Sequence, residues 1–206
     1  MIDLKYSLLG FVIAFTGSIV PSFLNMTVLK YSLKSGKNAA FYVIGGFATV
    51  LFFQANIGAY FSSLLMDNTD YILIFQKVGT GILILLSINF FRMYITKGAD
   101  QKKVNVQKSK AYFHGVGLSL LNTFAIPFYF TAISLLIGLE YFEYSFKNGL
   151  IFSVGSTLGS FLMYSIYATI ASRIEDRLTF IASKMDLILA CLTGIVGIGN
   201  LIFLLK

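Results

Sequence analysis

The sequence predicts an all-α integral membrane protein with six transmembrane helices, arranged as an inverted repeat of three plus three helices with proline breaks in helices 1 and 4. Its composition, its long apolar segments and the matching positions of its prolines predict this fold. Of the 206 residues, 57% are hydrophobic and only 12% are charged, and the mean hydropathy is +0.80. A soluble domain is about 45–50% apolar and about 25% charged, so a soluble globular protein is excluded.

Six apolar segments are each long enough to cross a membrane as a helix, which takes about 20 residues. Helices are the expected spanning element because they satisfy their own backbone hydrogen bonds. The predicted spans are roughly residues 4–30, 39–64, 71–95, 112–138, 146–172 and 183–205. Polar connections are expected at 30–38, 66–70, 96–110, 140–145 and 172–180.

Basic residues predict the orientation of these spans. With six spans, the connections after spans 1, 3 and 5 lie on one side of the membrane, and this side holds 12 of the 16 Lys and Arg residues. Cytoplasmic connections are enriched in these residues. We therefore expect a multi-pass protein of the cytoplasmic (inner) membrane with both termini outside the cytoplasm. The net charge of +7 then reflects these connections, and no nucleic acid partner is expected.

The longest basic connection, 96–111, divides a single transporter domain, 1–206, into halves of about 1–95 and 112–206. Because each half has three spans, a repeat that relates the halves must be inverted in the membrane. The chain has two prolines, Pro21 deep in span 1 and Pro127 deep in span 4. Proline removes a helical hydrogen bond and clashes with the preceding turn, so both spans are expected to break there.

Two broken helices predict a central binding site. Free N–H and C=O groups at half-helix ends suit the carboxylate and ammonium groups of an amino acid, and rocking of the two halves would give alternating access. Gln54 is a further inward-facing candidate. These polar residues could also serve only as interhelical hydrogen bonds. The candidate substrate-binding residues are Ser18, Pro21, Ser22 and Asn25 at the first break, and Asn122, Thr123, Pro127 and Thr131 at the second.

Other functional classes lack the residues they need. A metal exporter would need His, Cys, Asp or Glu clusters in the spans, and a hydrolase would need a Ser–His or paired-carboxylate set. The spans show neither, so no metal, cofactor or enzymatic activity is expected. A carboxylate proton relay is also not visible, which leaves the coupling ion open. A channel remains an alternative, although kinked half-helices fit alternating access better.

Two stretches resemble the LysE/RhtB family of amino-acid exporters, and the resemblance covers essentially the whole chain. Residues 10–46 resemble the opening pattern of the family, in which Pro21 aligns with the first proline of a Pro-Gly-Pro motif. Residues 114–136 resemble its fourth span, which carries Leu-Asn-Pro-Lys-Ala. The matching residues are Gly36, Gly45 and Gly46 in the first stretch, and Gly115, Gly117, Leu121, Asn122, Ala125 and Phe128 in the second.

The chain departs from both family motifs. Pro-Gly-Pro is replaced by Pro21-Ser22-Phe23, and Asn-Pro-Lys by Asn122-Thr123-Phe124 with a proline at Pro127. The resemblance implies export of amino acids or related small zwitterionic metabolites from the cytoplasm. The alternatives are an exporter of another small ion or metabolite in the same superfamily and a non-transporting membrane scaffold. The expected partners are the amino-acid substrate and membrane lipid, and a homodimer is compatible with the sequence.

Overall fold

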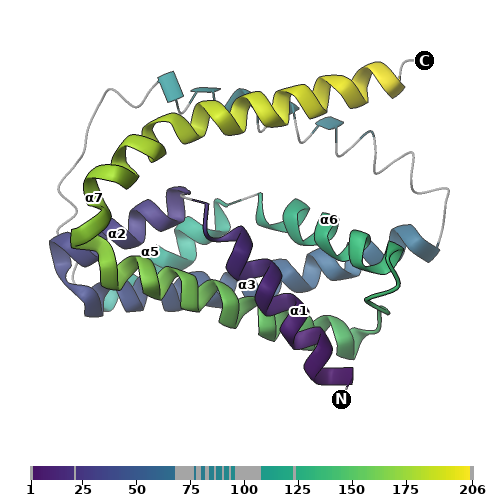
Figure 1. The fold of residues 1–206 in the computed structure, drawn as a ribbon, viewed down its shortest axis with the longest axis horizontal. Coiled ribbons are helices and arrows are strands. Elements are labelled where there is room, and N and C mark those ends of the chain that lie inside the picture. The colour runs from purple at the N-terminus through teal and green to yellow at the C-terminus, as the bar shows by residue number, and fades with distance from the viewer. Residues whose placement is uncertain are drawn as a thin grey trace. The chain divides into compact units, whose positions relative to one another are not determined.

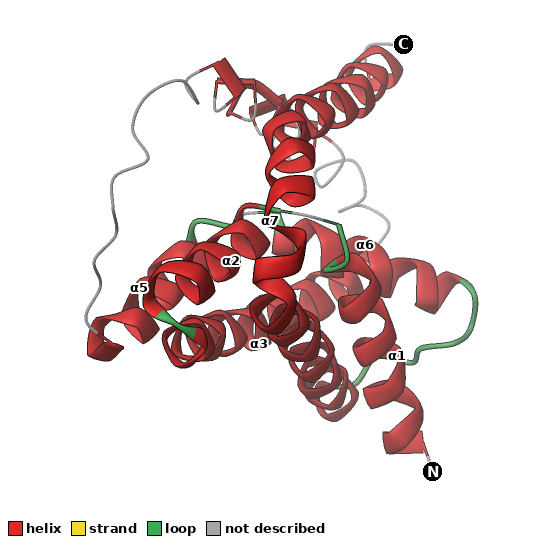
Figure 2. Cartoon of the chain, turned by 60° about the vertical axis from the view of Figure 1, so that its left-hand side comes forward, coloured by secondary structure: helices red, strands yellow, loops and turns green. Residues whose placement is uncertain are grey.

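The structure is a computed structural model, and every described segment of it is helix or loop (Figures 1 and 2). The helices are α1 (Ile2–Gly17), α2 (Phe23–Ser35), α3 (Lys37–Asp67), α5 (Lys108–Leu120), α6 (Ala125–Gly138) and α7 (Phe146–Leu204). The described residues are 2–20, 22–67, 77, 80–81, 84–85, 87–89, 91–92, 94–95, 108–122 and 124–204.

Helix breaks occur in both predicted regions. Residues 18–22 separate α1 from α2, and residues 121–124 separate α5 from α6, which are bent by 61° relative to each other. Pro21 lies outside the described residues. Pro127 lies in the first turn of α6, where the missing N–H of a proline costs no helical hydrogen bond. Gly36 alone separates α2 from α3, and its φ of 85° favours glycine.

The predicted connection at 172–180 is helical, because α7 continues from Phe146 to Leu204, although the apolar segment that could cross a membrane ends at Ala171. The segment SRIEDRLTF contains neither glycine nor proline. Arg, Glu and Leu are good helix formers, so polarity alone does not end the helix there.

The described chain forms two compact units. The first comprises Met1–Leu64 and Val104–Glu175, and the second comprises Leu65–Lys103 and Asp176–Lys206. In the second unit, the Ser87 hydroxyl donates a hydrogen bond of 2.7 Å to the Ala190 carbonyl. A Cβ atom on Gly194 would lie 2.8 Å from Ser87 Oγ. Ser87 therefore packs closely against α7 within that unit.

In the first unit, α3 and α5 approach through glycines. A Cβ atom added to Gly46 of α3 would overlap the carbonyl oxygen of Tyr112 on α5. A Cβ atom added to Gly115 of α5 would overlap the carbonyl oxygen of Val43 on α3. Small residues allow such close backbone approach between membrane helices.

The contact between α1 and the N-terminal part of α7 is built in the same way (Figure 1). A Cβ atom on Gly155 of α7 would overlap the carbonyl oxygen of Ser7, and one on Gly10 of α1 would overlap that of Phe152. Phe152 itself is fully buried. The glycines of the predicted spans 2 and 5 thus pack against the first helix of the opposite half.

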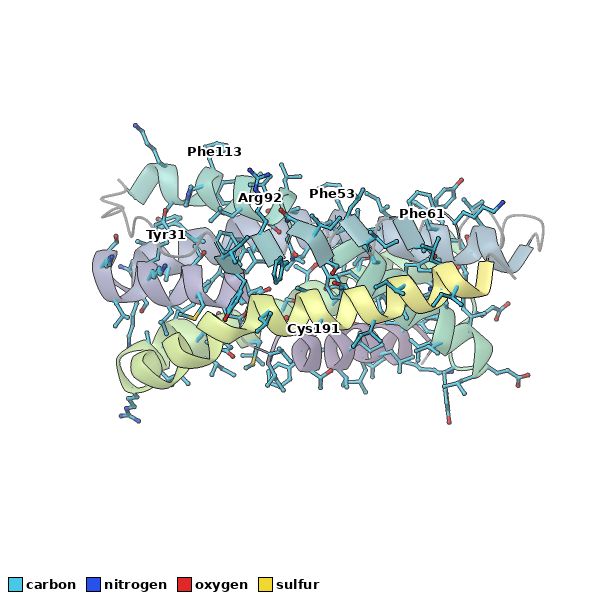
Figure 3. All side chains as sticks on the ribbon, turned by 90° about the horizontal axis from the view of Figure 1, so that it is seen from above. Tyr31, Phe53, Phe61, Arg92, Phe113 and Cys191 are labelled. Atoms are coloured by element: carbon cyan, nitrogen blue, oxygen red, sulfur yellow. The ribbon has the colours of Figure 1, made fainter. Side chains whose placement is uncertain are left out.

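Polar side chains join α2 to α5 at one edge of the first unit. The Tyr31 hydroxyl of α2 lies 2.7 Å from Nδ1 of His114 on α5, and the Tyr31 side chain is visible at that edge in Figure 3. Tyr31 is buried, whereas His114 is exposed. The pair therefore closes the interface between these helices at its solvent-accessible margin.

The outer faces of the helices are apolar, as expected for a protein in lipid. Phe53 of α3 is 60% exposed and Phe113 of α5 is 73% exposed, and both project outward in Figure 3. Among the described residues, two helical segments are long and apolar enough to cross a membrane, Lys37–Leu64 and Phe146–Ala171. The bent pair of α5 and α6 adds a third if it forms one span.

Candidate functional site

The first helix break is held together by a fully buried Asn25 side chain. Asn25 Oδ1 accepts hydrogen bonds from the Ser22 backbone N–H, at 3.1 Å, and from the Ser22 hydroxyl. Its amide Nδ2 donates to the Ser18 carbonyl at 2.9 Å. Ser22 has the extended backbone typical of an N-cap, and Asn25 is the third residue of α2. A single amide therefore satisfies backbone groups on both sides of the break.

Helix α7 supplies further partners to the first break. The Tyr167 hydroxyl donates to the Ile19 carbonyl at 2.6 Å, and the Ser18 and Ser160 hydroxyls lie 3.4 Å apart. Tyr164 also faces the Ser18 side chain. Carbonyls freed at the end of a helix need such donors. The end of α1 is thus anchored to the hydroxyl-bearing face of α7.

Gln54 of α3 bridges the second helix break, and only 6% of this residue is exposed. Gln54 Nε2 donates to the Ser119 carbonyl at 3.2 Å and to the Asn122 carbonyl at 3.3 Å. These carbonyls belong to the last turn of α5 and to the break itself. Gln54 therefore binds backbone groups at the second break, as Asn25 does at the first.

Two polar atoms beside the second break have no hydrogen-bond partner in the described part of the chain. They are Gln54 Oε1 and Ser119 Oγ, and both are buried. A buried polar atom without a partner costs about 1–3 kcal/mol. Within the described residues, the second break thus has buried polar atoms without a hydrogen-bond partner, whereas the Asn25 side chain at the first break has its partners. A bound ligand that donates hydrogen bonds would satisfy these atoms.

The two breaks lie close to each other within the first unit. Gly17, the last residue of α1, packs so closely on the Phe128 ring of α6 that a Cβ atom would overlap it. Ser160 of α7 faces Ser18 on one side and the Tyr129 hydroxyl of α6 on the other. Side chains of α6 and α7 therefore lie beside the end of α1. The polar side chains around the two breaks are called the polar cluster below; they are Ser18, Ser22, Asn25, Gln54, Ser119, Tyr129, Ser160, Tyr164 and Tyr167.

The predicted residues of the first break fall in this cluster. Ser18, Ser22 and Asn25 are joined by the hydrogen bonds given above. Asn25 is fully buried, whereas Ser18 and Ser22 are partly exposed. Pro21 lies outside the described residues.

The predicted residues of the second break are placed less uniformly. Asn122 is half-buried in the break, and within the described residues its side chain makes no hydrogen bond. Pro127 is half-buried at the start of α6, and Thr123 lies outside the described residues. Thr131 is exposed and donates to the Pro127 carbonyl of its own helix at 2.9 Å, so it lies apart from the cluster.

The polar face of α7 was not predicted from the sequence. Five buried residues recur at helical spacing along it, Ser153, Ser156, Ser160, Tyr164 and Tyr167. Spacings of three and four residues place them on one side of the helix. That periodicity is visible in the sequence and could have identified the face, but Ser and Tyr at single positions in an apolar segment carry no signal of their own.

Comparison with known families decides what kind of protein carries this cluster. The family model described as LysE type translocator matches residues 15–203. The chain belongs to the LysE type translocator family. No curated protein and no solved structure matches it. As a LysE type translocator with long apolar helices, it is an integral membrane transporter.

The match includes both helix breaks and every residue of the polar cluster. In this LysE type translocator the cluster is built from neutral hydroxyl and amide groups together with helix ends. Within the described ranges, no three His, Cys, Asp or Glu side chains lie close enough to hold a metal ion. The arrangement is suited to binding through hydrogen bonds and helix-end partial charges.

Proposed function

We propose that this translocator exports amino acids or related small zwitterionic metabolites from the cytoplasm by alternating access. The observation that carries the proposal is that two helix breaks lie in one compact unit and are linked there through α6 and α7, since Gly17 packs on Phe128 and Ser160 lies beside both Ser18 and Tyr129. The beginnings of α2 and α6 present backbone N–H groups, which suit a carboxylate, and the ends of α1 and α5 present carbonyls, which suit an ammonium group. Broken helices of this kind form the substrate sites of many transporters.

The close glycine contacts support the proposal that the fold is an inverted repeat of three plus three helices. In the pair formed by α3 and α5, Gly46 contacts the Tyr112 carbonyl, three residues before Gly115. Gly115 in turn contacts the Val43 carbonyl, three residues before Gly46. In the pair formed by α7 and α1, Gly155 and Gly10 follow the same rule. The second span of each half thus packs on the first span of the other half in the same register. A two-fold pseudosymmetry axis in the membrane plane would produce this pairing.

The division into compact units agrees with the same pseudosymmetry. The first unit contains the predicted spans 1, 2, 4 and 5, and the second contains the predicted spans 3 and 6. Each unit therefore takes equivalent segments from both halves. Separate folding of the two sequence halves would instead have produced one unit from each half.

Counterflow in proteoliposomes tests the proposed function. Vesicles that contain the purified protein and are loaded with a mixture of unlabelled amino acids are expected to accumulate external labelled amino acids, because exchange needs only a shared site with alternating access. Vesicles without protein provide the background. A well-folded protein that exchanges no amino acid would contradict the proposal and would favour another metabolite or a scaffold role.

We propose that the protein lies in the cytoplasmic membrane with both termini outside the cytoplasm, since 12 of its 16 basic residues would then lie in cytoplasmic connections. A reporter enzyme that is active only in the periplasm is expected to be active when fused after Lys206 and inactive when fused within 96–110. The reverse pattern of activity would contradict this orientation and place both termini in the cytoplasm.

A further inference from the structure

The two helix breaks differ in how completely their polar groups are satisfied. At the first break, both polar atoms of the Asn25 side chain are used within the protein, by Ser22 and Ser18. At the second break, the Gln54 amide donates both N–H groups, but its oxygen and the Ser119 hydroxyl have no partner among the described residues. Within the described part of the chain, unpartnered buried side-chain atoms therefore occur at the second break and not at Asn25 of the first.

The orientation of the Gln54 amide follows from its neighbours. Nε2 bridges the carbonyl oxygens of Ser119 and Asn122. The opposite orientation would place Oε1 against these two oxygens, and acceptor would then face acceptor. Oε1 is consequently directed away from both carbonyls, and it has no partner among the described residues.

The chemistry of these atoms selects the group that would bind them. Gln54 Oε1 is an acceptor only, and Ser119 Oγ can accept as well as donate. Both lie at the C-terminal end of α5, where the helix dipole places partial negative charge. The adjacent Asn122 side chain is half-exposed and makes no hydrogen bond within the described part of the chain. A cationic donor of several hydrogen bonds fits this environment, and a carboxylate does not.

We propose that Gln54 Oε1 and Ser119 Oγ, at the end of α5, bind the ammonium group of the transported amino acid. The inference rests on the proposed function and deepens it, because it assigns one pole of the zwitterion to one break. The carboxylate is then left to the N–H groups at the beginnings of the other half-helices. Asn25 holds the first break in shape and does not contact the substrate.

Ser119→Ala is the most direct test, because Ser119 Oγ has no partner among the described residues that the substitution would disrupt. The readout is the preference for an amine, measured by how well two matched pairs compete in counterflow: L-alanine with L-lactate, and L-leucine with its 2-hydroxy acid. The wild-type protein is expected to prefer the amino acid in each pair. Ser119→Ala is expected to lower that preference about tenfold, since a hydrogen bond to a charged group is lost.

Thr80→Val is the matched control. Thr80 is also buried and its hydroxyl also lacks a partner in the described residues, but it belongs to the second compact unit and not to either helix break. This variant is expected to keep the wild-type preference. Gln54→Met provides a second variant of similar side-chain size, and it is expected to lower the preference at least as much as Ser119→Ala. Its melting temperature shows whether the loss of the carbonyl contacts also destabilises the protein.

The outcomes separate the inference from the proposed function. If the wild-type protein exchanges amino acids but Ser119→Ala and Gln54→Met keep its preference for the amine, the ammonium subsite is overturned and the proposed function stands. If Thr80→Val lowers the preference as much as Ser119→Ala, the effect is not specific to the second break, and the subsite is again overturned. If the wild-type protein exchanges no amino acid, both proposals fail.

Discussion

Replacing Gly155 by alanine is expected to lower the melting temperature of the protein by about 2–12 °C. The added Cβ atom would overlap the Ser7 carbonyl oxygen, and two more backbone atoms of Ser7 lie within 2.9 Å of it. Backbone cannot move aside as a flexible side chain can, so α1 must shift away from α7. Forced overpacking of this kind costs about 1–3 kcal/mol, and in a chain of this size each 1 kcal/mol lowers the melting temperature by roughly 2–4 °C. Thermal unfolding in detergent, followed by circular dichroism, measures the change.

Gly117→Ala is the matched control for this substitution. Gly117 is also a helical glycine, but nothing lies within 4 Å of the position that its Cβ atom would occupy. Alanine favours the helix over glycine by up to about 1 kcal/mol, so this variant is expected to be unchanged or slightly more stable. Similar melting temperatures for the two variants would show that the close contact between α1 and α7 is not formed in solution.

Asn25→Leu is expected to destabilise the protein by about 3 kcal/mol and to abolish transport. Leucine has a similar size but no polar atoms, so the Ser18 carbonyl and the Ser22 N–H, both partly buried, would lose the partner that the fully buried Asn25 side chain provides. Each buried group left unsatisfied costs about 1–3 kcal/mol. Melting temperature and counterflow are both measured, and both are expected to fall.

Asn148→Ala serves as the control for an asparagine that also binds backbone. The Asn148 side chain donates to the Glu143 carbonyl at 2.8 Å, but at an exposed position where water can replace it. The expected loss is under about 1 kcal/mol, with transport retained. A stable Asn25→Leu protein with normal counterflow would contradict the role of Asn25 in holding the first break.

Local chemistry made part of this architecture predictable from the sequence. Breaks were expected at Pro21 and Pro127, and the chain leaves the helix nearby, at 18–22 and 121–124, although Pro127 itself lies in the first turn of α6 and Pro21 lies outside the described residues. Asn25 could be singled out because an amide in an apolar segment needs a partner, and its partners lie within seven residues of it. Such short-range contacts follow from helix geometry alone.

Contacts distant in sequence could not be predicted in the same way. Gln54 binds carbonyls 65 and 68 residues away, and no local pattern in α3 indicates that partner. The same holds for Tyr167, whose acceptor Ile19 is 148 residues away. Continuity of α7 through 172–180 was missed for another reason, since the polar composition of that segment was given more weight than its helix propensity.

The reciprocal glycine contacts limit which parts of this translocator can move during transport. The first helix of each sequence half packs against the second helix of the other half. The backbones of α3 and α5 are in contact at Gly46 and Gly115, and those of α1 and α7 at Gly10 and Gly155. Rotation of one half as a rigid body against the other would therefore have to break both close helix contacts, the one between α3 and α5 and the one between α1 and α7. Under the proposed alternating access, we therefore expect access to the polar cluster to change through rearrangements that leave these two helix pairs intact, such as bending at the breaks themselves.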